Sequence, residues 1–207
     1  MKKYLVIGNP IEHSLSPKLH NYWLKKNKIN AVYEKKMINN NEIEKIILKI
    51  RSNELHGVNV TVPYKNVVVE YMDILTKEAN ETKSVNTIYL KDQKIIGHNT
   101  DIAGFELGLR SYGYDAKKKN IFIFGAGGVV PSIIVALKKM GASKISLYNR
   151  TVSKSENVKK LFSDIEIIDK KNIPNDIDML INASSVGINI NDKIDLNYEK
   201  IGSNKFY

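Results

Sequence analysis

The chain has 207 residues, 43% of them apolar and 26% charged, which is sufficient for a packed core in one large or two small domains. It has no cysteine, which excludes disulfide scaffolds, Cys-ligated metal or iron–sulfur sites and a thiol nucleophile. The formal charge is +10, but only three basic residues are arginines and the lysines are dispersed, so we expect small anions rather than nucleic acid as partners.

The first half of the chain alternates predicted strands and helices. The predicted strands cover 3–8, 31–38, 58–62, 87–90 and 94–98, the last two as a hairpin. One helix is expected to open at Ser16-Pro17, with Ser16 as its N-cap and Leu19, Tyr22 and Trp23 on its apolar face. A second, at 41–52, has isoleucines at helical spacing, and 67–72 fits either a short helix or a strand.

The second half predicts a more regular βαβαβ series. Its elements are a helix at 101–112, a strand at 120–124, helices at 129–140 and 153–162, and strands at 145–149, 165–168 and 179–182. Short connections between them predict a parallel sheet with right-handed crossovers. The expected boundary lies near Asn99-Thr100-Asp101, which gives domains at 1–100 and 101–207.

A glycine-rich turn follows the 120–124 strand and opens the next helix. In Gly125-Ala126-Gly127-Gly128, the first glycine permits a tight turn and Gly127 lets backbone N–H groups approach a pyrophosphate at the helix N-terminus. Val129 also belongs to this turn, and Val130 stands where a third small residue is usual. The alternative is an ordinary strand–turn–helix corner.

The end of the next strand bears on the choice of cofactor. An NAD site would place an acid here, whereas this strand ends in Asn149-Arg150-Thr151, with Lys154 close behind. A guanidinium and a hydroxyl suit a 2′-phosphate, so we predict NADP, against the alternative of a surface arginine. The loop after the last predicted strand is expected to lie near the nicotinamide. Its candidate cofactor residues are Ser184, Ser185 and Val186.

Three polar clusters, at 8–21, 57–65 and 84–101, complete a pattern with the glycine turn and the Asn-Arg-Thr triplet. Together they resemble the shikimate dehydrogenase family, in order and over nearly the whole chain. The resemblance implies an α/β fold in which an N-terminal α/β substrate domain precedes a Rossmann-like NADP-binding domain. It also implies NADPH-dependent reduction of 3-dehydroshikimate to shikimate.

The same resemblance implies the substrate-site residues, each of which also has a simpler structural role. Ser14 and Ser16 would bind the substrate carboxylate, although Ser16 could only cap a helix. The other implied substrate ligands are Asn59, Thr61, Lys65, Asn86 and Asp101. Lys65 would transfer the proton and Asp101 would pair with it; burial lowers a lysine pKa and a nearby carboxylate raises it, so the balance stays open. No metal-ligand spacing is present.

The chain also departs from the family pattern. The family continues beyond Tyr207, so we expect an incomplete NADP domain at the C-terminus and a poor, marginally stable enzyme. Val129 and Ile188 replace an expected small residue and methionine. The alternatives are a quinate/shikimate enzyme using NAD, or a non-catalytic nucleotide-binding fragment of a larger or fused polypeptide. We expect a cytoplasmic protein with a small-molecule substrate and no membrane partner, as a monomer or a homodimer.

Overall fold

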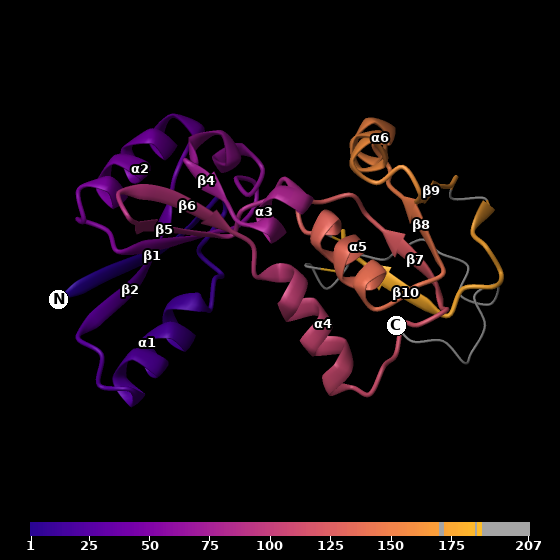
Figure 1. The fold of residues 1–207 in the computed structure, drawn as a ribbon, viewed down its shortest axis with the longest axis horizontal. Coiled ribbons are helices and arrows are strands. Elements are labelled where there is room, and N and C mark those ends of the chain that lie inside the picture. The colour runs from indigo at the N-terminus through magenta and orange to yellow at the C-terminus, as the bar shows by residue number, and fades with distance from the viewer. Residues whose placement is uncertain (170–171, 185, 188–207) are drawn as a thin grey trace. The chain divides into compact units, whose positions relative to one another are not determined.

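The computed structural model of the chain describes residues 1–169, 172–184 and 186–187. The chain divides into two compact units, Met1–Thr100 and Asp101–Tyr207, which we describe one at a time (Figure 1). Among the described residues, no helix is both long enough and apolar enough to cross a membrane.

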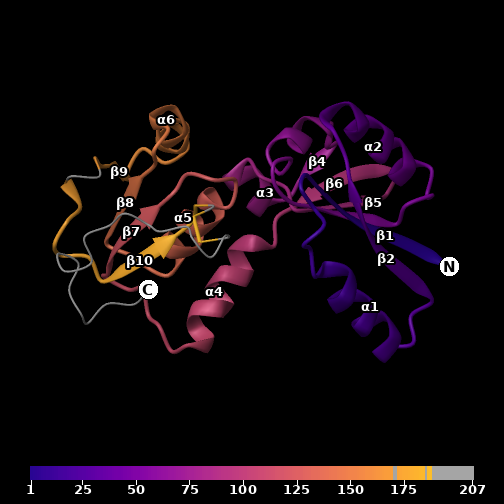
Figure 2. The same ribbon diagram turned by 180° about the vertical axis from the view of Figure 1, so that it is seen from behind.

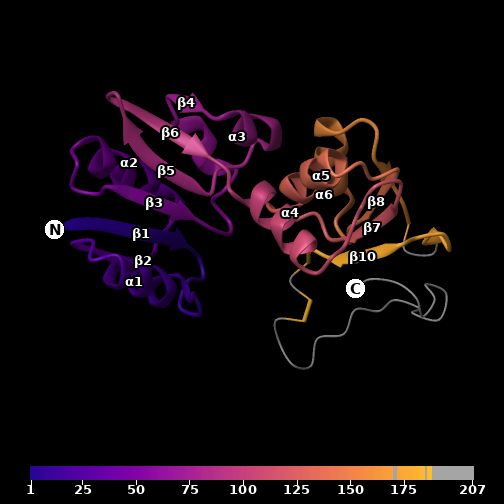
Figure 3. The same cartoon turned by 60° about the horizontal axis from the view of Figure 1, so that its bottom comes forward.

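The first unit is built on a mixed six-stranded sheet in the order β2-β1-β3-β5-β6-β4, which Figure 3 shows from β2 to β6. Its strands are β1 (Lys2–Gly8), β2 (Ala31–Met37), β3 (Gly57–Val60), β4 (Ile74–Leu75), β5 (Thr87–Lys91) and β6 (Lys94–His98). Strands β2, β1 and β3 are parallel, and β5 is antiparallel to both β3 and β6. The predicted hairpin of β5 and β6 is confirmed.

Helices cover both faces of this sheet. They are α1 (Ser16–Lys26), α2 (Ile43–Arg51) and α3 (Lys77–Thr82), with 3₁₀ helices at Asn40–Glu42 and Val67–Tyr71. Helices α1 and α2 lie on opposite faces (Figure 1). The four isoleucines of α2 are buried against β1, β3, β5 and β6 and form the main core of the unit. The 67–72 segment therefore takes the helical alternative.

Helix α1 packs in a way that contradicts the sequence prediction. The expected apolar face is wrong, because Leu19, Tyr22 and Trp23 are 48%, 60% and 46% exposed. The helix instead contacts β2 through His20, whose ring stacks on Tyr33 with centroids 4.1 Å apart. The predicted N-cap is also wrong: Ser16 is already helical, and the N-cap position is occupied by Leu15, which has no capping side chain.

Asn21 makes the second contact between α1 and the edge strand β2. Its side-chain amide donates to the Tyr33 carbonyl at 2.7 Å, and its oxygen accepts the Tyr33 N–H at 3.0 Å. The side chain thus pairs both backbone groups that Tyr33 presents at the open edge of the sheet. Exposed edges invite pairing with other chains, and Asn21 blocks that pairing at Tyr33.

In the described part of the second unit, four strands form a parallel sheet in the order β10-β7-β8-β9, seen from behind in Figure 2. Its strands are β7 (Asn120–Phe124), β8 (Lys144–Tyr148), β9 (Glu166–Ile167) and β10 (Met179–Asn182); its helices are α4 (Asp101–Ser111), α5 (Val130–Lys139) and α6 (Val152–Leu161). The predicted α/β fold with a parallel second sheet is confirmed.

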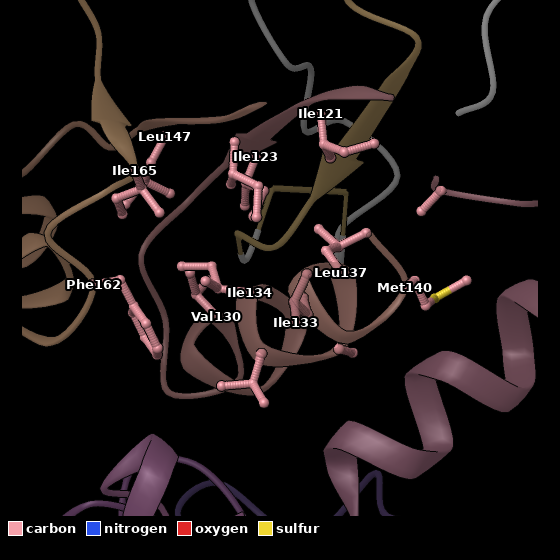
Figure 4. Packing of buried hydrophobic residues seen from close by; sticks show 14 of the residues in the cluster. Ile121, Ile123, Val130, Ile133, Ile134, Leu137, Met140, Leu147, Phe162 and Ile165 are labelled. Carbon is pink, nitrogen blue, oxygen red and sulfur yellow. The ribbon is translucent and has the colours of Figure 1, made fainter. Parts of the chain in front are cut away.

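The apolar side chains of β7 point alternately to the two faces of the sheet, which explains why both faces are buried. Ile121 and Ile123 pack with the helices, around the buried α5 (Figure 4), whereas Phe122 and Phe124 join a second cluster on the opposite face. Successive side chains of a strand point to opposite faces, so one apolar run supplies two cores.

Titration of His20 gives the first testable prediction. Burial lowers the pKa of His20 below its usual 6.5, so the unfolded chain binds a proton more readily than the folded one. Above pH 6.5, His20 is neutral in both states and takes nothing from the free energy of unfolding. As the pH falls through 6.5, the unfolded chain gains a proton that the folded chain binds less readily, so the free energy of unfolding decreases. Carboxylates with lowered pKa values, such as Asp73, act in a separate, more acidic window.

We therefore expect the melting temperature of the chain to fall between pH 7.5 and 5.5, and to fall less in His20→Gln. Thermal unfolding by circular dichroism measures both slopes. His13→Gln, at an exposed loop position, is the matched control. An identical pH slope in His20→Gln and in the unchanged chain would contradict the prediction.

Candidate active site

The candidate substrate residues of the first unit gather at one edge of the mixed sheet, where the parallel strands β1 and β3 have their carboxyl ends. Strands β1 and β3 are parallel, so the loops that follow Gly8 and Val60 leave the sheet at the same edge. The two loops touch: the Asn9 N–H donates to the Val62 carbonyl at 3.0 Å. A Cβ on Gly8 would stand 2.5 Å from the Thr61 side chain, so only glycine allows this approach. The antiparallel hairpin brings 86–87 and 98–100 to the same edge.

Asn59 projects from β3, and its side-chain amide makes three hydrogen bonds inside the unit. Its oxygen accepts the Tyr33 hydroxyl at 2.6 Å, and its nitrogen donates to the Asn86 carbonyl at 3.2 Å and to the Thr87 hydroxyl at 3.1 Å. Both N–H groups of the amide therefore have partners inside the unit. Only one lone pair, on the side-chain oxygen of Asn59, is left to accept a further hydrogen bond.

Asn86 is buried and holds the segment that leads out of the first unit. Its side-chain oxygen accepts the Thr100 N–H at 3.0 Å, and its nitrogen donates to the Thr100 hydroxyl at 2.8 Å. Asn99, next to Thr100, is also buried and donates to the Ser84 carbonyl at 2.9 Å. Asp101 follows directly and begins α4, so its backbone position is set by a fixed neighbour.

The other candidate substrate residues lie on the loops at this edge. The Ser14 hydroxyl accepts the Ser16 N–H at 3.3 Å, which folds the loop before α1 back on itself. Thr61 donates its N–H to the Ile7 carbonyl. The backbone carbonyl of Lys65 accepts the Val85 N–H at 2.8 Å, which anchors the residue. Lys65 as a whole is half-buried.

In the second unit, the glycine turn connects β7 to α5. Gly125 has φ +115°, and a Cβ there would lie 2.7 Å from the Ala183 and Ser184 backbone, so this position requires glycine. The Gly125 N–H donates to the Tyr148 carbonyl at 2.7 Å. Gly127 is exposed, and Gly128 and Val129 lead into α5, which begins at Val130 with Pro131 in its first turn.

Asn149 joins this turn to the loop after β8. Its side-chain oxygen accepts the Ala126 N–H at 3.1 Å, and its nitrogen donates to the Thr151 carbonyl at 2.8 Å. Arg150, Thr151 and Lys154 are exposed at the same edge of the sheet. The strands β7 and β8 are parallel, so a cationic and hydroxyl-bearing loop lies beside the glycine turn.

The loop after β10 is organised by Asn182, which the sequence analysis did not single out. Its side-chain oxygen accepts the Ser184 N–H at 3.1 Å, and its nitrogen donates to the Val186 carbonyl at 2.9 Å. An asparagine at a strand end, followed by two serines, is the sequence signal for such a turn. Ser185 and Ile188 lie outside the described residues. Among the residues that are described, no His, Asp or Glu cluster could hold a metal.

Comparison with known proteins agrees with this geometry. Residues 6–88 match the family model described as the shikimate dehydrogenase substrate binding domain. Over 206 residues the chain is 54% identical to the shikimate dehydrogenase (NADP(+)) of Pelagibacter ubique, covering 100% of this chain and 77% of that one. The chain belongs to the shikimate dehydrogenase family.

Solved structures of the family have the same fold. The crystal structure of shikimate dehydrogenase from Aquifex aeolicus aligns with a TM-score of 0.91 at 34% identity, covering 99% of this chain and 77% of that one. The Thermus thermophilus shikimate 5-dehydrogenase, in complex with NADP(H) and shikimate, aligns with a TM-score of 0.86 at 26% identity, covering 97% and 75%. The chain thus spans about three quarters of the length of these relatives.

The requirement for glycine at position 125 gives a second prediction. In Gly125→Ala, the new methyl group meets immobile backbone at a φ that alanine avoids, and we expect a loss of about 2–4 kcal/mol in the free energy of unfolding. Chemical denaturation followed by circular dichroism measures the change. Gly108→Ala on α4, with nothing within 4 Å, is the control and should gain about 0.5–1 kcal/mol. Equal stability of the two variants would refute the close packing at Gly125.

Proposed function

We propose that this chain catalyses the NADP-dependent interconversion of 3-dehydroshikimate and shikimate. The observation that carries the proposal is the gathering of Ser14, Thr61, Lys65 and Asn86 at one sheet edge, in a chain 54% identical to a named NADP(+) shikimate dehydrogenase. In this proposal the first unit binds the substrate, as the name of the model matched by residues 6–88 also suggests.

The residues of the second unit fit NADP as a cofactor. The glycine turn leaves no room for a Cβ at Gly125 and keeps Gly127 exposed, which suits backbone approach to a pyrophosphate. Arg150 and Lys154 supply positive charge beside it, and β8 ends without the acid typical of NAD sites. This donor set supports NADP over the NAD alternative. Ser184 and Val186 are assigned to the nicotinamide side.

The proposed chemistry is a hydride transfer coupled to a proton transfer. NADPH held by the glycine turn and Arg150 would supply the hydride for the ketone carbon and would thereby be oxidised to NADP⁺. The Lys65 ammonium polarises the ketone oxygen and donates the proton that completes the new hydroxyl; in reverse, neutral Lys65 accepts that proton. Asp101 is assigned as the carboxylate partner of Lys65, and Ser14 and Ser16 are assigned to the substrate carboxylate.

The function is tested by following NADPH formation at 340 nm when shikimate and NADP⁺ are added to the purified chain. Quinate with NADP⁺ and shikimate with NAD⁺ are the comparison reactions. A larger kcat/KM for shikimate with NADP⁺ than for either comparison is expected. No turnover, with no binding of shikimate detectable by calorimetry, would exclude the function for this chain.

Removal of the Lys65 amine tests its role in proton transfer. We expect Lys65→Ala to lower kcat about 10²–10⁴-fold with a smaller change in the KM for shikimate, because proton transfer acts mainly in the transition state. Lys91→Ala, at the exposed end of β5 next to the hairpin turn, is the control lysine. A kcat for Lys65→Ala within a few-fold of the unchanged chain would remove Lys65 from the mechanism.

Arg150 is tested through the selectivity between the two nicotinamide cofactors. We expect Arg150→Ala to weaken NADPH binding about 10- to 150-fold and to leave NADH binding nearly unchanged, because the guanidinium is assigned to the 2′-phosphate. Fluorescence titration with each cofactor measures both constants. Arg110→Ala, which removes an exposed arginine paired with Glu106 on α4, is the matched control. Equal losses for NADPH and NADH would contradict the assignment.

A further inference from the structure

Tyr33 lies on β2, outside the three polar clusters at 8–21, 57–65 and 84–101. Its hydroxyl nevertheless contacts Asn59, which lies in the second of these clusters. The residue is 4% exposed, and its ring extends across β1 to donate to the Asn59 oxygen at 2.6 Å. The stacked ring of His20 and the two backbone bonds from Asn21 hold Tyr33 in place. A buried phenol with one fixed acceptor has little freedom to move.

The contacts of Asn59 determine which way its amide points. The Asn86 carbonyl can only accept, so the Asn59 nitrogen must face it, and the Asn59 oxygen must face Tyr33. The Tyr33 hydroxyl is therefore the donor in this pair. Burial raises the pKa of Tyr33 above its usual value, which keeps that proton in place.

Hydrogen bonds continue from Asn59 to the last residue of the unit. The Thr87 hydroxyl accepts from Asn59 and donates to the Asn86 side-chain oxygen at 3.0 Å. The same oxygen accepts the Thr100 N–H, and the Asn86 nitrogen donates to the Thr100 hydroxyl. A connected series of buried or half-buried polar groups thus runs from Tyr33 to the residue that precedes Asp101.

We propose that Tyr33 is a positioning residue of the substrate site, acting through Asn59 on Asn86 and Thr100. This proposal rests on the proposed function, because Asn86 belongs to the substrate site proposed there and the family resemblance implies the same role for Asn59. Tyr33 touches neither substrate nor cofactor. It fixes the amide of Asn59, and Asn59 in turn fixes the Asn86 carbonyl and the Thr87 hydroxyl, so removal of one phenolic hydroxyl loosens the whole series.

The first test is Tyr33→Phe, with Tyr4→Phe as its control. Tyr4 pairs with Tyr33 in the strand register and packs, half-buried, against the same cluster, so its variant removes a phenolic hydroxyl from a neighbouring position on the same face of the sheet. We expect Tyr33→Phe to raise the KM for shikimate about tenfold and to leave the KM for NADP⁺ within twofold. Equal changes in the two KM values, or the same change in Tyr4→Phe, would overturn the proposal.

A double-substitution cycle tests whether Tyr33 acts through Asn59. In an Asn59→Ala background, the hydroxyl of Tyr33 has lost its acceptor, so adding Tyr33→Phe should change the KM for shikimate less than twofold. If the two substitutions instead multiply, Tyr33 acts on the site by another route and the proposal is wrong.

A measurement without turnover separates this proposal from the proposed function. In ¹⁵N-labelled chain, Tyr33→Phe should shift the Asn59 side-chain amide signals and speed hydrogen exchange at the Thr100 N–H at least tenfold, whereas Tyr4→Phe should do neither. If the chain fails to oxidise shikimate, the function fails but these signals still test the positioning. Unchanged Asn59 and Thr100 signals in Tyr33→Phe would overturn it whatever the activity.

Discussion

The buried amide of Asn86 is the contact on which the organisation of the first unit depends. Its backbone carbonyl accepts the Val60 N–H, its own N–H donates to the His98 carbonyl, and its side chain binds the N–H and the hydroxyl of Thr100. One residue thus joins β3, β6 and the segment leading to α4. Loss of any partner would leave a buried amide group unsatisfied, at a cost of about 1–3 kcal/mol. This edge of the first sheet is therefore held in place at Thr100, where the chain leaves the first unit.

The second unit uses an asparagine for the same purpose. Asn149 joins the glycine turn to the loop after β8, as Asn86 joins the hairpin to Thr100. An amide suits both places because it donates and accepts at once, whereas a carboxylate could only accept and an ammonium only donate. A neutral group at Asn149 also adds no charge beside the residues assigned to phosphates. In both units, neutral amides fix the loops that carry the charged residues of the proposed site.

The sequence predicts most strands and the whole parallel sheet of the second unit, because alternating apolar runs such as the β7 segment have few other ways to be buried. It fails at α1, where the apolar spacing indicates the wrong face: stacking of His20 and pairing of Asn21 with Tyr33 decide the orientation. It misses α3, whose buried side chains are only Ala79 and Thr82. Tyr33 and Asn59 lie 26 residues apart and join only in the folded sheet, so no local pattern marks the pair.

In the first unit, the groups that position the proposed site are chemically different from the group proposed to transfer a proton. The series from Tyr33 to Thr100 consists of a phenol, amides and hydroxyls, all neutral near pH 7, and burial moves the pKa of Tyr33 further from that range. No proton therefore has to enter or leave this series while Lys65 exchanges the proposed proton with the substrate. A charged residue in this series would couple the position of Asn86 to each change in protonation. With neutral positioning groups, the proposed proton transfer can occur without moving the residues proposed to bind the substrate.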